Sequence, residues 1–143
     1  MGLRQTIASC AIIAIGSTAG CRLRSSIWVV RGSNSDRLVL GIAEEPDGRT
    51  PADNLQSLYV TRCPSSAKPR TIVWEVIALD APVRPAPLEV TYGVVPGGFS
   101  SPAGALPLTP GCYEVVAIGT GIAAGVQFVV RQDGAINPSQ RGS

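Results

Sequence analysis

The sequence predicts an all-β protein: a single antiparallel β-sandwich of about seven strands that follows an N-terminal signal segment. Three observations indicate this class. Gly and Pro number 16 and 12 among 143 residues, about a fifth of the chain, as is usual where short strands are joined by turns. Seven strand-like runs are separated by turn-rich segments. Four of those runs alternate apolar and polar residues, a pattern that antiparallel sheets with one wet face produce.

The expected strands follow one another at regular spacing between residues 26 and 131. They cover Ser26–Arg31, Arg37–Ala43, Ser57–Arg62, Thr71–Leu79, Leu88–Val95, Cys112–Ile118 and Gly125–Arg131. A period of two along four of the runs predicts the side chains that face the core. These are Leu38, Leu40 and Ile42; Ile72, Trp74, Val76 and Ala78; Leu88, Val90, Tyr92 and Val94; and Val126, Phe128 and Val130.

The connections between the runs carry their own predictions. Residues 44–54 are polar and contain two prolines, so we expect a long exposed loop. Residues 80–87 hold three prolines and should run extended, crossing between the two sheets. Residues 96–102 include Gly97 and Gly98, so we expect a mobile loop there as well. The tail, residues 132–143, lacks periodicity and is expected to be flexible.

The stretch Leu106–Gly119 is the one around which the chain is organised. Its first half is turn chemistry, because prolines fix φ and remove donors and Gly111 permits a conformation closed to other residues. Its second half is a strand in which Tyr113, Val115 and Ala117 share one face. The sequence therefore predicts a structural corner built from Leu108, Pro110, Gly111 and Tyr113.

Residues 1–20 have the composition of an export signal. A positively charged start precedes an apolar run over Ile7–Ile15, and small residues fill positions 16–20 before Cys21. The segment resembles a bacterial lipoprotein signal, whose cleavage box ends in two small residues and a cysteine, matched here by Ala19, Gly20 and Cys21. Position 18 is Thr where that family usually has Leu.

This resemblance implies cleavage after Gly20 and lipidation of Cys21, with residues 21–25 forming a short tether. Several acyl chains would anchor the domain stably to a membrane. An Asp after the cysteine often marks retention in the inner membrane, and this chain has Arg22, so the outer membrane is the expected destination. Two alternatives stay open. One is a plain secretory signal cut near Ala19, and the other is a transmembrane helix, which needs about twice the apolar length present.

The other two cysteines, Cys63 and Cys112, lie inside the expected domain and predict a disulfide. With Trp74 they have the order and approximate spacing of the immunoglobulin cysteine, tryptophan, cysteine set. The immunoglobulin tyrosine lies two residues before the second cysteine, whereas Tyr113 follows Cys112 directly. If Tyr113 points inward, Cys112 points outward, so we expect a disulfide between strand ends and not across the core. Two free thiols are the alternative.

Three segments of the second half carry a further resemblance. Tyr92–Phe99, Leu106–Tyr113 and Phe128–Val130, with Ile72–Val76 upstream, resemble a pattern in small, uncharacterised bacterial lipoproteins, over roughly residues 70 to 131. They are also similar to fibronectin type III and related immunoglobulin-like sandwiches, whose corner tyrosine follows a Leu, a Pro and a Gly. The resemblance implies an immunoglobulin-like fold and an envelope address, and it brings no activity with it.

Composition argues against several classes of function. The net charge is +2 with scattered basic residues, so we expect no nucleic-acid partner. His is absent, which removes the commonest general base and a common metal ligand. We therefore expect no catalytic residue, no cofactor and no metal site.

Three weaker motifs have simpler interpretations. The segment Gly119–Ala124 matches a loose dinucleotide fingerprint, but a strand follows it where a helix is required, so a glycine-rich hairpin is favoured. Ser100 and Ser101 lack a histidine partner, and Lys68 is the chain's only lysine. Acidic residues match no calcium loop and are expected to be solvated: Asp36, Glu44, Glu45, Asp47 and Asp53.

A partner-binding surface is the remaining prediction. Tyr92 and Tyr113 are explained by core packing and by the corner, whereas Phe99 beside Gly97 and Gly98 is the candidate contact, with a ring that tucks back onto the domain as the alternative. The sequence thus predicts a non-catalytic, lipid-anchored envelope module that binds a protein or glycan or serves a structural role. The alternative is a small envelope enzyme or an accessory subunit of one.

Overall fold

The computed structural model describes residues 26–44, 49–119 and 122–138. Within these ranges the regular structure consists of nine strands. They are β1 (Ser26–Val29), β2 (Val39–Ala43), β3 (Ser57–Arg62), β4 (Ile72–Ala78), β5 (Glu89–Thr91), β6 (Phe99–Ser100), β7 (Gly111–Gly119), β8 (Ile122–Val130) and β9 (Ile136–Pro138). The expected signal peptide, Cys21 and the tether to residue 25 lie outside the described residues.

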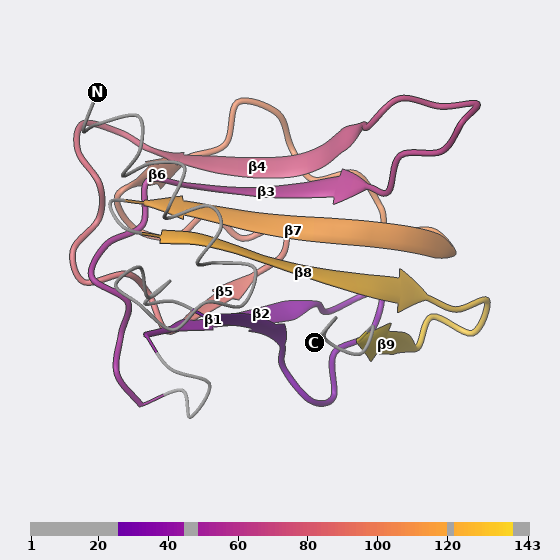
Figure 1. Ribbon diagram of the computed structural model, residues 1–143, viewed down its shortest axis with the longest axis horizontal. Coiled ribbons are helices and arrows are strands. Elements are labelled where there is room, and N and C mark those ends of the chain that lie inside the picture. The colour runs from indigo at the N-terminus through magenta and orange to yellow at the C-terminus, as the bar shows by residue number, and fades with distance from the viewer. Residues whose placement is uncertain (1–25, 45–48, 120–121, 139–143) are drawn as a thin grey trace, which may run out of the picture.

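The strands form two antiparallel sheets that lie in separate layers (Figure 1). One sheet has three strands in the order β1-β2-β5, and the other has six in the order β6-β4-β3-β7-β8-β9. The predicted all-β antiparallel sandwich is confirmed. Each of the seven predicted runs overlaps one of the strands, with β7 longer than predicted at both ends and β8 beginning three residues earlier, and β6 and β9 are additional.

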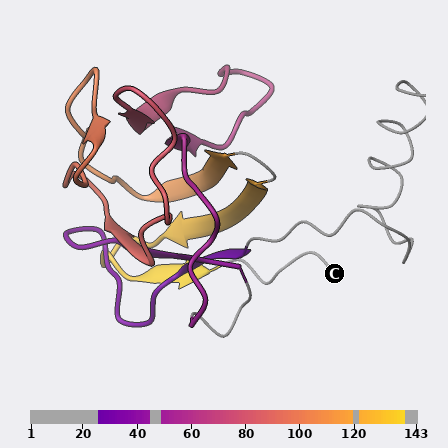
Figure 2. The ribbon, with the colours of Figure 1, turned by 90° about the vertical axis from the view of Figure 1, so that its left-hand side faces the viewer.

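Two connections pass from one sheet to the other at the same end of the sandwich (Figure 2). One joins β2 to β3, and the other, residues 79–88, joins β4 to β5. Within the second, Val83 forms an antiparallel bridge with Leu55, so the two crossing segments support each other. The prediction that the proline-rich segment crosses between sheets is confirmed.

The core lies between the sheets and draws on both. Outside a bulge in β4, alternate residues of the longer strands point into it, which places the following side chains among the largest fully buried ones: Leu40, Ile42, Leu58, Val60, Val76, Val90, Tyr113, Val115, Phe128 and Val130. The Tyr113 and Phe128 rings stack with centroids 5.4 Å apart, and Trp74 meets Tyr92 edge-on at 5.1 Å. Burial of this much apolar surface is the main favourable contribution to folding.

Ile72 corrects the prediction that every second residue from 72 to 78 faces the core. Strand β4 carries an irregularity against β3: Val60 pairs with Trp74, but Thr61 pairs with Ile72, so Val73 is the extra residue. The bulge reverses the alternation, leaving Val73 buried and Ile72 50% exposed.

Strand β5 corrects two further core assignments. Its pairing with β2 covers only Glu89–Thr91, and Val94 N–H closes a turn onto Thr91 O. Because the strand is so short, alternation does not extend to its flanks. Val90 is buried as predicted, whereas Leu88 and Val94 are exposed.

The C-terminal segment corrects the expected domain boundary at residue 131. Strand β9 pairs with β8 in the register Val130↔Ile136, and Ala135 forms a bridge with Asn34. A turn held by Gly134 N–H on Arg131 O brings the chain back. The sheet therefore includes residues up to Pro138, and the expected flexible tail is replaced by an edge strand over part of its length.

No helix among the described residues is long and apolar enough to cross a membrane.

Candidate binding surfaces

The predicted structural corner is a hydrogen-bonded turn at the start of β7. The Tyr113 hydroxyl donates to Thr109 O at 2.8 Å and accepts from Thr109 N–H at 3.0 Å. Leu108 is buried beneath the turn, and Gly111 has φ +146°, a conformation that favours glycine. The structure brings these residues together with Pro110 as the sequence predicts. Their role is to fix the entry of β7, because the phenol satisfies both backbone groups of Thr109.

Arg62 contacts the same corner from the solvent side in two ways. The Arg62 guanidinium lies 5.4 Å from the Tyr113 ring centroid, and Arg62 Nη2 also contacts Thr109 Oγ1. Arg62 is the last residue of β3 and pairs with Tyr113 in the sheet register. A cation over the face of a buried phenol adds to the packing of the corner.

The cysteines expected to pair form a disulfide at the rim of the six-stranded sheet. Cys63 directly follows β3 and Cys112 is the second residue of β7, with Cα atoms 5.3 Å apart. Cys63 N–H also donates to Cys112 O at 3.0 Å. The bond links neighbouring strands of one sheet and does not cross the core, in agreement with the outward parity of Cys112.

Phe99 is placed differently from the sequence expectation of a partner contact. Its N–H bonds Pro96 O in a tight turn, and it pairs with Ala78 in strand β6. Pairing at the β4 edge turns the ring inward, where it is only 6% exposed. Gly97 and Gly98 stay exposed on the turn. The loop therefore presents backbone to solvent and not the aromatic ring.

Tyr92 ties the loop before the corner to the edge of β4. Its hydroxyl lies 2.6 Å from Leu106 O and 3.2 Å from Val73 O, and Leu106 N–H also donates to Val73 O. These bonds occupy the β4 edge where β6 does not reach, which leaves fewer unpaired backbone groups there. Tyr92 and Tyr113 are thus structural residues, as predicted.

Replacing Tyr92 with Phe is expected to cost about 1 kcal/mol of unfolding free energy near neutral pH, because it removes this hydrogen bonding. Burial raises the pKa of Tyr92 from 10.0 to about 12, with a further increase from Tyr113 and an opposing effect from Arg62. The folded state keeps the proton longer than the unfolded state, so this stabilisation is complete below pH 10 and is lost as the pH rises towards 12.

Urea unfolding across that pH range measures the effect. As the pH rises across it, we expect the free energy of unfolding of the wild type to fall by about 1 kcal/mol more than that of Tyr92→Phe. This figure is reduced for the partial exposure of the phenol. Tyr59→Phe, on the outer face of β3, is the matched control and should follow the wild type. Parallel curves for the wild type and Tyr92→Phe would contradict the prediction.

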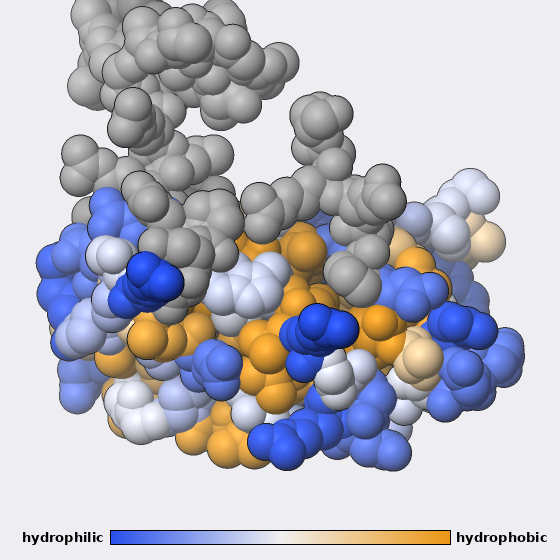
Figure 3. All heavy atoms as spheres, turned by 90° about the horizontal axis from the view of Figure 1, so that it is seen from below, coloured by the Kyte–Doolittle hydropathy of each residue, from blue (hydrophilic) through white to orange (hydrophobic). Residues whose placement is uncertain are grey.

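The outer face of the three-stranded sheet carries an indole. Trp28 pairs with Gly41, and a Cβ at position 41 would lie 2.2 Å from the indole Cε2 atom, so the ring rests on the glycine backbone. Ile27 points the other way, into the core. Figure 3 views this side of the molecule and shows apolar side chains across its middle with strongly hydrophilic ones among them.

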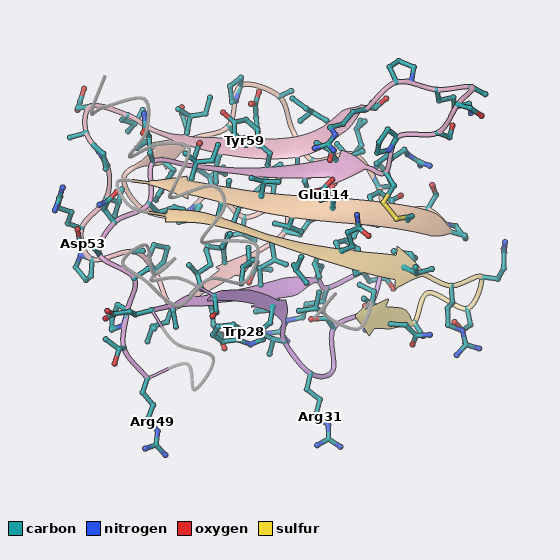
Figure 4. The ribbon with its side chains drawn as sticks, viewed as in Figure 1. Trp28, Arg31, Arg49, Asp53, Tyr59 and Glu114 are labelled. Atoms are coloured by element: carbon teal, nitrogen blue, oxygen red, sulfur yellow. A yellow bond between two sulfur atoms is a disulfide. The ribbon has the colours of Figure 1, made fainter. Side chains whose placement is uncertain are left out.

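The outer face of the six-stranded sheet carries a second surface, which we call the Tyr59 surface. The register places these side chains side by side across β4, β3 and β7: Tyr59, Glu75, Ile77, Val116 and Ile118. Ile118 is 39% exposed, and Tyr59, Ile77 and Val116 are partly buried. Glu114 follows on β7 and binds Arg70 at 2.9 Å. Tyr59 and Glu114 are labelled on this sheet in Figure 4.

The sequence interpretation overlooked the Tyr59 surface, although a signal was present. If Tyr113, Val115 and Ala117 face inward, then Val116 and Ile118 must face outward on the same strand. Apolar residues at outward positions of a strand are a mark of a contact surface. Apolar residues occur on both faces of β7, so apolar–polar alternation does not distinguish the outward face of this strand from the inward one.

An open hollow lies between the start of β7 and the end of β8. It has a volume of about 580 Å³ and is lined by Pro110, Gly111, Val130, Arg131, Gln132 and Asp133. Arg131 and Asp133 pair with each other at 3.7 Å. The lining is therefore a turn whose charged groups are already engaged.

The acidic residues and the serine and lysine candidates do not form a site in the described structure. In the described part of the chain, no three His, Cys, Asp or Glu side chains gather at one point. Asp53 binds Arg84 at 3.3 Å, while Glu45 and Asp47 lie outside the described residues. Ser100 pairs with Ile77 near the end of β4, whereas Lys68 lies in the connection before β4 begins, so the serine and lysine are not brought together.

The glycine-rich segment after β7 connects two strands of a hairpin. Strands β7 and β8 pair antiparallel along their whole length, up to Gly119↔Ile122. The hairpin interpretation is confirmed, and the helix that a dinucleotide fingerprint requires is replaced by a strand.

Comparisons of the chain with protein-family models, with curated proteins and with solved structures found no match.

Proposed function

We propose that this chain is a non-catalytic lipoprotein module of the bacterial cell envelope. It is anchored through acylated Cys21, with the outer membrane as its destination, and it presents the Tyr59 surface to a protein or glycan partner. The observation that carries the binding role is that surface: an aromatic and three aliphatic side chains lie outward on a paired, disulfide-linked sheet. A rigid sheet face holds such groups in place, so little ordering is required when a partner binds.

An immunoglobulin-like identity for the sandwich is part of the proposal. Strand neighbours β1-β2-β5 correspond to A-B-E, and β3-β7-β8 correspond to C-F-G of the immunoglobulin arrangement. Tyr113 bonds the backbone four residues upstream, as the tyrosine corner of those domains does. Two features depart from the pattern: β4 joins the edge beside β3, and the disulfide links β3 to β7 within one sheet.

The disulfide also supports the envelope address. Such bonds persist in oxidising compartments outside the cytoplasm, and the Cys63–Cys112 pair lies at the rim of the sheet. With the small residues before Cys21 it favours export.

The alternative of an envelope enzyme or accessory subunit has less support. A catalytic site is expected to be a hollow with convergent polar groups. The hollow beside Pro110 offers Arg131 and Asp133, which neutralise each other. The outward Tyr59 surface fits recognition better than chemistry.

One experiment in cells tests both parts of the proposal. A photo-crosslinking residue is placed at position 59 of the full chain, and membranes are then isolated. We expect the intact mass of the chain to carry an acyl increment on Cys21, and Cys21→Ser to remove that increment and release the protein from the membrane. We also expect a covalent adduct with one protein or glycan from position 59.

The matched control carries the same crosslinking residue at position 79. Leu79 is exposed but lies beyond the end of β4, outside the Tyr59 surface. Adduct from position 79 and not from 59 would contradict the binding surface. A membrane-extracted chain without the acyl increment would contradict the anchor.

A further inference from the structure

The side of the domain that carries Trp28 is tied closely to the expected anchor. Trp28 is seven positions after Cys21, and described structure begins at Ser26, the first residue of β1. An extended chain advances about 3.3–3.6 Å per residue, so the five steps from Cys21 to Ser26 span at most about 18 Å. Whatever path the tether takes, β1 stays close to the lipid headgroups.

Trp28 has the chemistry of a residue at a membrane interface. It is partly exposed on the outer face of the three-stranded sheet, and Gly41 beneath it leaves no side chain to support the indole from below. An indole combines an apolar body with an N–H donor, which is why tryptophan is enriched at the headgroup level of membranes. The ring is held by the sheet and so meets the membrane without being reordered.

Positive charge accompanies the indole on this side. Arg31 is exposed in the loop after β1, and it takes part in none of the ion pairs recorded among the described residues. Figure 4 shows Arg31 directed away from the sandwich on the side where Trp28 lies. The tether adds Arg22 and Arg24. Guanidinium groups bind phosphate with two parallel hydrogen bonds, and basic residues beside an anchor are attracted to anionic lipid.

An opposing charge lies on the same face. Glu89 is exposed on β5 in register with Gly41. Figure 4 shows Arg31 and Arg49 on either side of Trp28. The indole is therefore flanked by cationic side chains, and Glu89 adds a negative charge two strands away from it.

We propose that the outer face of the three-stranded sheet docks on a phospholipid surface, with Trp28 in the headgroup layer and Arg31 on lipid phosphate. This inference rests on the proposed anchor at Cys21. It adds an orientation: the Tyr59 surface, on the opposite sheet, then faces away from the membrane and is open to a partner.

The test uses the lipidated full chain in vesicles of phosphatidylcholine and phosphatidylglycerol. Fluorescence quenching by lipid brominated on its acyl chains reports Trp28, and subtracting the signal of Trp28→Phe removes the contribution of buried Trp74. We expect quenching of the wild type. Arg31→Gln should shift the balance between docked and undocked domain about fivefold towards undocked, the equivalent of about 1 kcal/mol per basic residue.

Lys68→Gln, which removes one exposed positive charge from the β3–β4 connection, is the matched control and should leave quenching unchanged. Flotation of the protein with the vesicles reports the anchor separately. A protein that floats while its quenching equals that of Trp28→Phe overturns the docked face and leaves the anchor standing. Equal quenching in Arg31→Gln and the wild type overturns the phosphate contact. A protein that does not float overturns the anchor, and the docking with it.

Discussion

Removal of the Cys63–Cys112 disulfide is expected to lower the free energy of unfolding by about 4 kcal/mol. The two cysteines are separated by 49 positions, and a crosslink closing a loop of that length restricts the unfolded chain by about this amount in the entropic model. The free energy of unfolding of a small domain is only about 5–15 kcal/mol, so loss of the disulfide would leave the protein marginally stable at physiological temperature. Urea unfolding of the Cys63→Ala/Cys112→Ala variant against the oxidised wild type measures it.

Reduction of the wild type provides an independent route to the same quantity. A thiol reductant should bring the wild type to the stability of the double variant and leave the double variant itself unchanged. If the oxidised and reduced wild type unfold at the same urea concentration, the disulfide does not contribute to stability and the prediction is wrong.

Truncation of Phe128 to Ala is expected to cost about 3–5 kcal/mol, the range for a large aromatic side chain in a well-packed core. Phe128 is fully buried and stacks on Tyr113 at 5.4 Å with an interplanar angle of 14°. The cavity would open beneath the corner, since Tyr113 holds Thr109 from the other side. Thermal unfolding should show the loss, together with weaker protection of the Thr109 amide from hydrogen exchange.

The neighbouring residue supplies the control. Val129 points to the opposite face of β8 and is 41% exposed, so Val129→Ala should change the free energy of unfolding by less than about 0.5 kcal/mol. Comparable losses for the two variants would mean that the inward and outward faces of β8 are assigned incorrectly.

The presence of the longer strands could be predicted from the sequence because apolar and polar residues alternate strongly where a strand is long and one of its faces is solvated. In the last run, Val126, Phe128 and Val130 alternate with Gln127 and Arg131, and the structure buries Phe128 and Val130 while Gln127 and Arg131 are exposed. The corner could be predicted for a different reason: Pro110, Gly111 and Tyr113 each favour one local conformation, and all three conformations are compatible with one turn.

The residues whose orientation was predicted wrongly share a cause: in a short segment, pairing with the neighbouring strand determines which way each side chain points. Ile72 became exposed because a bulge against β3 shifted the register, and nothing in the residues of β4 alone specifies a bulge. Strand β6 has two residues and β9 ends in Pro138, so neither shows a period. Phe99 is a candidate partner contact by sequence because it lies in a glycine-rich loop, but pairing with Ala78 directs its ring inward.

The binding surfaces could be predicted only in part. The Tyr59 surface is assembled from β3, β4 and β7, and its members become neighbours only when the strand order is known. The proximity of Trp28 to Gly41 likewise depends on the pairing of β1 with β2. Predictions at Cys21 rest on local sequence and stay predictions, since that residue lies outside the described structure.

The β3–β4 connection gives this protein an unusual practical property. Lys68 is the only lysine of the chain, and it is exposed in a turn in which Ser65 and Lys68 exchange backbone hydrogen bonds. An amine-reactive dye, bead or crosslinker therefore has one side-chain target, at the end of the sandwich beside the disulfide. Molecules coupled through Lys68 would share one pose, leaving both sheet faces accessible to soluble ligands.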